Sequence, residues 1–383
     1  MRDDETPIAV SDLSYGQEEV DAVVDVVKSQ WLTMGPRTEE FERHLASYLE
    51  ADNVIAVNSG TSALHLGLLS MGIGPGDEVI TTPMTFVASA NCILYTGATP
   101  VFADIDKNTF NIDPNLVEDN ITPKTRAVLP VHLAGLPAEM DHLLEICERH
   151  DLAMLDDAAH AIGAEYKGKR IGGLESVTAF SFFSNKNLAV GEGGAITSND
   201  DETAQRLRLM RSHGLTKPTW SRHHKKDEES LDQLYDMTEL GFNYRITEIG
   251  AALGITQLSK LDSNNSRRRE MYMLYRELVE DLPLEFQETP DYVKHSHHVL
   301  PVLLPHGTRS KVRAHLLERG VGTSIHYTPI HKFTYYRKLG YSDLYLPNSN
   351  EVGSRVVTLP LHQNITDNDV NRVITSLKES LRL

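Results

Sequence analysis

The chain has 383 residues, enough for two domains of ordinary size, and its 40% hydrophobic and 24% charged residues are typical of a soluble globular protein. Asp and Glu number 54 against 37 Lys and Arg, so the formal net charge of −17 opposes binding to nucleic acid or to anionic membrane. Two cysteines cannot form a disulfide framework, and we expect neither a signal peptide nor a membrane span, which together predict a cytoplasmic protein.

The first part of the chain alternates short apolar runs with helical stretches. A helix is expected over 37–50, where Phe41, Leu45 and Leu49 form one apolar stripe. Strands are expected at 53–57, 78–81, 100–104, 127–131 and 153–155, and further helices at 61–71, 85–95 and 139–150. This alternation predicts an α/β domain with a mainly parallel sheet sandwiched by helices.

The later part predicts the rest of this domain and a smaller one. Strands are expected at 177–183 and 194–198, then helices at 202–212 and 248–261, with a long polar loop over 213–237. The polar run at 262–266 is expected to break the last helix. We therefore divide the chain into a large cofactor-binding domain, 1–262, and a small α+β domain, 263–383. The N-terminal helical segment is a candidate to pack on the small domain.

Polar residues follow the predicted strands, at the sheet edge where ligands bind in open α/β folds. Asn58-Ser59-Gly60-Thr61-Ser62 ends one strand and opens a helix, whose free amides suit a phosphate. The simpler reading is a helix cap. Asp157 follows another strand and could pair with a protonated pyridine nitrogen, although Asp156 competes for that role.

Two further residues complete a possible cofactor site. Lys186 lies in a loop that leads to Gly191-Glu192-Gly193-Gly194, and a lysine amine can form a Schiff base, although most lysines are surface charges. Phe86 could stack on a planar ring or could belong to the core. A phosphate cradle, a carboxylate, an amine and an aromatic ring are the parts that a pyridoxal phosphate site needs.

With these motifs the sequence resembles the DegT/DnrJ/StrS family of sugar aminotransferases, which are fold type I pyridoxal phosphate enzymes. The resemblance extends from residues 32–36 to residues 359–362 and is strongest at 58–63, 157–160, 181–194 and 241–245. It implies the fold type I architecture, with a large sandwiched sheet domain and a smaller C-terminal α+β domain.

The resemblance also implies roles for single residues. Lys186 would hold the cofactor and shuttle protons, Asp157 would pair with the pyridine nitrogen, and His160 would lie near the ring. Phe86 would stack on the cofactor, and Asn243 would reach the cofactor phosphate of a neighbouring subunit in a homodimer. The cofactor phosphate would be bound by Gly60, Thr61, Ser62 and Ser181.

The implied reaction moves an amino group from an amino acid, glutamate in our expectation, to a keto group of a deoxysugar linked to UDP, dTDP or GDP. Lys186 argues against relatives that carry histidine there and act as dehydratases. Candidate substrate-binding residues are Trp220, Arg222, Arg245, His326, Tyr327 and His331. The basic run at 222–226 could equally be a solvated loop. The pathway, whether for a polysaccharide or for an antibiotic sugar, stays open.

Two other functions and a metal site are the alternatives. A different fold type I enzyme acting on free amino acids would share Lys186 and Asp157. A ligand-binding regulator is opposed by the acidic charge and by the lack of a helix-turn-helix pattern. A metal site is rejected, because strand spacing would send His297 and His298 to opposite faces.

Overall fold

The computed structural model describes residues 6–217 and 235–382. Its centre is a seven-stranded sheet with the order β1-β9-β8-β5-β4-β2-β3. The strands are β1 (Asn53–Val57), β2 (Glu78–Thr81), β3 (Thr99–Phe102), β4 (Thr125–Leu129), β5 (Ala153–Asp157), β8 (Val177–Ser181) and β9 (Gly194–Ser198). Only β9 runs antiparallel to its neighbours in this sheet, so the prediction of a mainly parallel sheet is confirmed.

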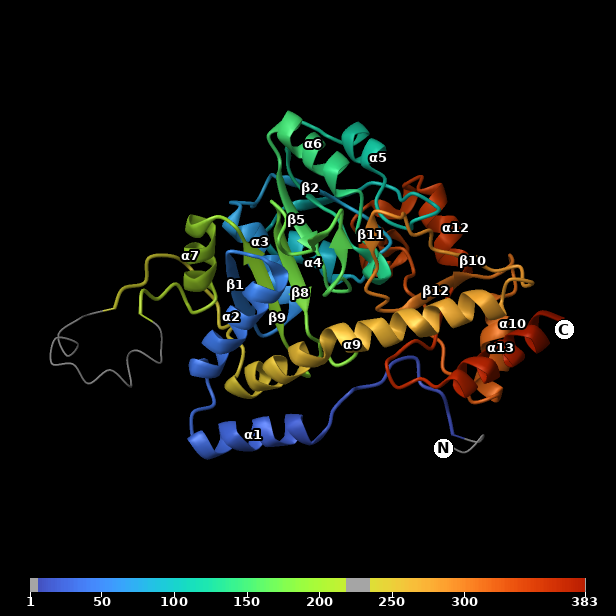
Figure 1. Ribbon diagram of the computed structural model, residues 1–383. Coiled ribbons are helices and arrows are strands. Elements are labelled where there is room, and N and C mark those ends of the chain that lie inside the picture. Colours follow the sequence, from blue (N-terminus) through green and yellow to red (C-terminus); the bar gives the residue numbers. More distant parts are fainter. Residues whose placement is uncertain (1–5, 218–234, 383) are drawn as a thin grey trace.

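Helices cover both faces of the sheet because the strands bury side chains on both sides. On β1, Val54 and Ala56 join one hydrophobic core, and Ile55 and Val57 join the other. The first core also receives α2 (Pro36–Leu49), α6 (Met140–His150) and the first part of α9 (Glu248–Leu278). The second core receives α3 (Gly60–Ser70), α4 (Ala88–Tyr95) and α7 (Asp201–Met210) (Figure 1).

A second, smaller layered unit follows in the chain. Its antiparallel sheet has the order β10-β12-β13 and consists of β10 (Glu285–Phe286), β12 (Leu300–Leu303) and β13 (Val356–Leu359). A third core joins this sheet to α10 (Arg309–Glu318), α13 (Asp367–Arg382) and the end of α9 (Figure 1). The remaining elements are α1 (Gln17–Ser29), α5 (Pro114–Asp119), α11 (Thr334–Lys338), α12 (Pro347–Arg355), β6 (Glu165–Tyr166), β7 (Lys169–Arg170) and β11 (Val293–Lys294).

The expected helix break at 262–266 is wrong, because α9 continues through it. Several of its polar side chains find partners that are compatible with a helix. The hydroxyl of Ser263 donates to the Lys260 carbonyl at 2.8 Å, and Asp262 accepts a hydrogen bond from Tyr48 Oη at 2.6 Å. Because α9 serves both the large and the small core, the division into 1–262 and 263–383 remains a prediction.

Some predicted ends also shift. The strand expected over 177–183 ends at Ser181, and the helix expected over 85–95 begins at Ala88. Within the described residues, no helix combines the length and the apolar character that a membrane crossing needs. Cys92 and Cys147 are both buried free thiols.

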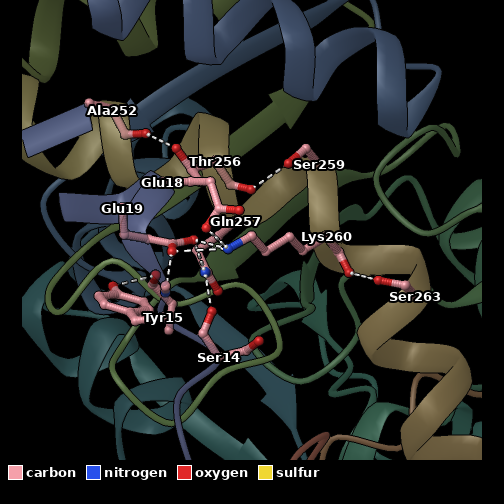
Figure 2. A network of polar contacts seen from close by, with 12 residues as sticks. Ser14, Tyr15, Glu18, Glu19, Ala252, Thr256, Gln257, Ser259, Lys260 and Ser263 are labelled. Atoms are coloured by element: carbon pink, nitrogen blue, oxygen red, sulfur yellow. Dashed lines mark hydrogen bonds and ion pairs between the residues drawn. The ribbon is translucent and has the colours of Figure 1, made fainter. Parts of the chain in front are cut away.

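The N-terminal part of the chain connects distant regions. Figure 2 shows Glu19 of α1 facing Gln257 and Lys260 of α9, which donate hydrogen bonds to its Oε1 at 2.7 Å and 2.9 Å. In the same view, Tyr15 lies beside this network, and its hydroxyl donates to the carbonyl of Ala189 at 2.9 Å. Before α1, Ile8 pairs with the backbone around Val321 in the small unit.

The start of α2 is held by a carboxylate from α9. Glu248 is buried and accepts hydrogen bonds from the amides of Gly35, Arg37 and Thr38, at 2.8 to 2.9 Å, and from the Thr38 hydroxyl at 2.7 Å. Helix N-termini have amides without helical acceptors and attract negative charge. Glu248 therefore ties α2 to α9 across one face of the sheet.

We predict that Glu248→Gln lowers the free energy of unfolding by about 2–3 kcal/mol, because one charged acceptor becomes an amide donor that faces other donors. Urea denaturation would measure the loss. Glu277→Gln, at an exposed position of the same helix, is the control and should change stability by less than about 0.5 kcal/mol. Equal effects of the two changes would show that Glu248 is not a cap.

Candidate active site

A cavity of about 720 Å³ opens at the carboxyl ends of the central strands. Its floor and walls come from the segments that follow β1, β2, β5 and β8, and residues 324–328 with Phe333 close it from the C-terminal part of the chain. Of the sequence-predicted residues, the cavity brings together Gly60, Thr61, Phe86, Asp157, His160, Ser181, Lys186, His326 and Tyr327. The cavity therefore lies at the strand ends where the sequence predicted a ligand site.

One end of the cavity is the N-terminus of α3. Ser59 caps this helix, its Oγ accepting from the Ser62 amide at 3.1 Å, and the Ala63 amide donates to the Ser59 carbonyl. The amides of Gly60 and Thr61 come before these and have no helical acceptor. At Gly60 an added Cβ would lie 2.7 Å from Ser181 Cβ, so glycine lets α3 start directly against the end of β8. This end suits an anion.

Ser62 does not line the cavity. It is buried, and its hydroxyl donates to Asn58 Oδ1 at 2.6 Å. Its position supports the cap, and its predicted contact with a phosphate remains untested.

Asp157 and Asp156 point to opposite sides of β5. Asp157 lines the cavity, where its Oδ2 accepts from Ser89 Oγ at 2.6 Å and its Oδ1 from the Ala159 amide at 3.1 Å. Asp156 is buried elsewhere, accepting from Ser176 Oγ at 2.6 Å. Burial raises the pKa of Asp157, although these hydrogen bonds act against that rise. The geometry therefore favours Asp157 as the carboxylate of the site.

Lys186 projects into the same cavity. The residue is partly accessible, yet its amine lies deep among protein atoms, and burial lowers its pKa to about 8 while the charge of Asp157 opposes the shift. Its Nζ lies 3.5 Å from His298 Nε2. An amine with this pKa is partly neutral near pH 7.5, as a nucleophile or a base must be.

His160 and Tyr327 form a fixed pair on the cavity wall. The Ala134 amide donates to His160 Nδ1 at 3.2 Å, so Nε2 carries the proton and donates to Tyr327 Oη at 3.1 Å. Burial lowers the pKa of His160 well below its usual range, which keeps the ring neutral. Beside it, the ring of Phe86 is 58% exposed, which excludes the core reading of this residue.

Other predicted residues lie outside the cavity. Asn243 is exposed, and its carbonyl accepts from Asn58 Nδ2 at 3.3 Å. Arg245 reaches Ser212 Oγ at 3.4 Å, and His331 is buried with its Nε2 3.0 Å from Asn350 Oδ1. Trp220 and Arg222, with the basic run at 222–226, lie outside the described residues.

The strand expected at the histidine cluster is not formed, although the side chains of His297 and His298 do face different neighbours. Residues 295–299 are not a strand, and His297 has a left-handed backbone with φ 49°. The rings of His295 and His297 stack, with centroids 4.2 Å apart, beside Tyr272, whereas the ring of His298 points to Lys186 and Asn187. Across residues 6–217 and 235–382, no group of three or more metal-ligating side chains is assembled.

Several residues of the site carried no clear sequence signal. Ser89 belongs to α4 and reaches Asp157 only through the fold. Asn185 lines the cavity with a buried Oδ1 that has no hydrogen-bond partner, and its place beside Lys186 was the one available hint. His298 Nδ1 lies 3.0 Å from Asn187 Oδ1, although the two residues are 111 positions apart in the chain.

This chain is similar to known proteins over most of its length. The model of the DegT/DnrJ/EryC1/StrS aminotransferase family matches residues 14–378. The spore coat polysaccharide biosynthesis protein SpsC of Bacillus subtilis is 39% identical over 374 residues, covering 96% of this chain and 95% of that protein.

Solved structures agree with the family match. DesV of S. venezuelae superposes with a TM-score of 0.90 at 36% identity, covering 99% of this chain and 100% of that one. The putative sugar aminotransferase Spr1654 of Streptococcus pneumoniae superposes in its PLP-form with a TM-score of 0.90 at 30% identity, covering 98% of both chains. Its PMP-form gives a TM-score of 0.91 at 30% identity and covers 99% of both chains.

The buried histidines with lowered pKa values determine how the free energy of unfolding should depend on pH. Burial lowers the pKa of His160 and His298 well below the usual range, that of His326 to about 4 and that of His297 to about 3. The unfolded chain therefore takes up protons first, near pH 6.5, and stability falls as the pH drops below that value. Asp157, whose pKa is raised, offsets part of the loss.

We expect His326 alone to account for about 3 kcal/mol of lost unfolding free energy between about pH 6.5 and pH 4, from the fall of its pKa to about 4. Urea denaturation at several pH values would measure the slope. His326→Asn should flatten the slope, and His44→Asn, at an exposed position of α2, is the matched control. A parent whose stability does not change over this range would contradict the prediction.

Proposed function

The chain belongs to the DegT/DnrJ/EryC1/StrS aminotransferase family and is a pyridoxal phosphate-dependent sugar aminotransferase, and from this premise we propose its substrates and the roles of its residues. The amino donor is proposed to be glutamate, and the acceptor a keto group on a deoxysugar linked to UDP, dTDP or GDP. The observation that carries the proposal is one cavity that joins Lys186, Asp157 and the N-terminus of α3.

The residues of the cavity fit the cofactor. Its phosphate would be held by the amides of Gly60 and Thr61 with Ser181 beside them. Asp157 would pair with the pyridine nitrogen, and this buried carboxylate with a raised pKa is suited to a cationic partner. Phe86 would lie against the ring. When bound, the cofactor supplies an electron sink for the bond-breaking steps.

Lys186 is proposed to bind the cofactor covalently and to carry protons between the substrate carbon and the cofactor. With a pKa of about 8, about a quarter of the amine is neutral at pH 7.5, which is far more than for an exposed lysine. His160, held by the Ala134 amide and by Tyr327, would keep a fixed neutral ring near the cofactor. These are general acid–base and positioning roles.

The sugar would enter over His326 and Tyr327, which line the cavity. The diphosphate of a nucleotide sugar needs cations in a chain with net charge −17. Four further residues are proposed for substrate binding: Arg245, His331, Trp220 and Arg222. Neither Arg245 nor His331 lines the cavity of its own subunit. An active homodimer, a place in polysaccharide biosynthesis and a cytoplasmic location are also proposed.

The family assignment decides between the functions left open by the sequence. A ligand-binding regulator and an enzyme acting only on free amino acids both give way to a sugar aminotransferase.

We predict that Lys186→Ala reduces transamination by at least about 100-fold while leaving the fold intact, because the amine that binds the cofactor and moves the proton is lost. The parent should gain visible absorbance on binding pyridoxal phosphate and lose it when glutamate is added. The variant should show neither change. Lys169→Ala, at an exposed position, is the control. A Lys186→Ala enzyme with full activity would contradict the proposed role of Lys186.

The substrate class is tested separately. Parent enzyme loaded with glutamate would be mixed with nucleotide-linked keto sugars, with the same sugars without the nucleotide, and with α-keto acids. Return of the visible absorbance with the nucleotide-linked sugars and with α-ketoglutarate, the keto acid that glutamate leaves behind, but not with the free sugars or with other α-keto acids, supports the proposal. An equal response to the free sugars would show that the nucleotide is not recognised.

We predict that Asn243→Ala weakens pyridoxal phosphate binding about tenfold, because a phosphate contact from the neighbouring subunit is lost. Mixing distinguishes this from a local effect. In a hybrid of Lys186→Ala and Asn243→Ala subunits, one site regains both residues if Asn243 acts across the dimer. Hybrids without recovered activity, or an Asn243→Ala variant with unchanged affinity, would refute the role.

A further inference from the structure

His298 lies beside the amine of Lys186 and has no role in the function proposed so far. It is buried in the segment between β11 and β12. Its Nε2 lies 3.5 Å from Lys186 Nζ, and its ring centroid lies 4.4 Å from that of His160. A histidine at this place can either accept a hydrogen bond from the amine or compete with it as a donor, depending on where its own proton sits.

The hydrogen bonds behind His298 determine the position of that proton. Asn187 Nδ2 donates to Asn265 Oδ1 at 2.7 Å and to the Ser296 carbonyl at 2.9 Å, which uses both of its N–H groups and fixes the amide orientation. Asn187 Oδ1 therefore faces His298 Nδ1, at 3.0 Å, as an acceptor. Nδ1 must carry the proton, and Nε2 presents a lone pair to Lys186.

The surroundings also keep His298 neutral. Burial lowers its pKa well below the usual range, and the positive charges of Lys186 and Arg268 act in the same direction, as would protonation of His160 or His326. Arg268 is fully buried on α9 and donates to the carbonyls of His298, at 3.1 Å, and Leu361, at 2.9 Å. These contacts hold the backbone of His298 and place a cation near its ring.

We propose that His298 is a positioning residue for Lys186, whose amine donates a hydrogen bond to His298 Nε2. The inference rests on the proposed role of Lys186. With one N–H group bound to His298, the lone pair of the neutral amine is directed away from that ring and is available in the cavity. The chain Asn265–Asn187–His298–Lys186 thus transmits a fixed orientation from α9 to the reacting amine.

The test compares His298→Leu, which removes the acceptor, with His298→Gln, whose amide oxygen can replace Nε2. Cofactor-free protein is mixed with pyridoxal phosphate, and the rise of visible absorbance is followed from about pH 6.5 to about pH 9.5. For His298→Leu we expect the plateau rate to fall at least about tenfold. The midpoint of the curve of rate against pH should move to lower pH by about one unit, because the ammonium form of Lys186 loses its hydrogen-bond acceptor.

The glutamine variant should stay within about threefold of the parent rate and keep its midpoint. A merely structural role would lower the plateau without moving the midpoint. The inference is overturned if His298→Leu has the plateau rate and the midpoint of the parent. It is also overturned if the plateau rate of His298→Gln is as low as that of His298→Leu. A parent that gains no absorbance at any pH would instead overturn the proposed role of Lys186, and the inference with it.

A second measurement is made on the parent protein, and a variant is needed only to assign one signal. Nitrogen-15 NMR of histidine-labelled parent protein reports which ring nitrogen carries the proton, and the signal of His298 is identified by its absence in His298→Gln. We expect the neutral form protonated on Nδ1 near pH 7, and for His160 the opposite form, protonated on Nε2. A His298 protonated on Nε2, or doubly protonated, would overturn the inference.

Discussion

The removal of one lysine amine from water organises the centre of this protein. A buried ammonium group is costly, so the amine of Lys186 gives up its proton more readily than an exposed lysine. Around it the fold provides one carboxylate, Asp157, and neutral imidazoles that accept or donate hydrogen bonds without adding charge. Each of these groups is held by a backbone amide or by a neutral side chain, which fixes its orientation in the cavity.

The long helix α9 carries much of this arrangement. It has 31 residues and is about 46 Å long, enough to run from the large core to the small one. Three of its polar side chains act at separate places: Glu248 on the start of α2, Asn265 on Asn187, and Arg268 on the backbone of His298. One continuous helix therefore contacts both the framework of the sheet and the segment behind Lys186.

The sequence predicted those parts that depend on local patterns. The strands at 53–57, 78–81 and 194–198 have the predicted ends because short runs of buried residues are bounded by turn residues. Lys186 and Phe86 were found because they follow strands. The choice between Asp157 and Asp156 needed the side of β5 that faces the cavity, and the contact of Ser89 with Asp157 spans 68 positions. The helical state of 262–266 depended likewise on distant partners such as Tyr48.

The cavity is lined by segments of both the sheet domain and the C-terminal part of the chain, including Lys186 on one side and Tyr327 on the other. A molecule bound between them adds its binding free energy to the stability of the folded state, in proportion to the logarithm of its concentration over its dissociation constant. Vitamin B6 supply thus becomes a determinant of how much of this protein a cell retains: chains made in excess of the cofactor unfold more often and are exposed more to proteolysis.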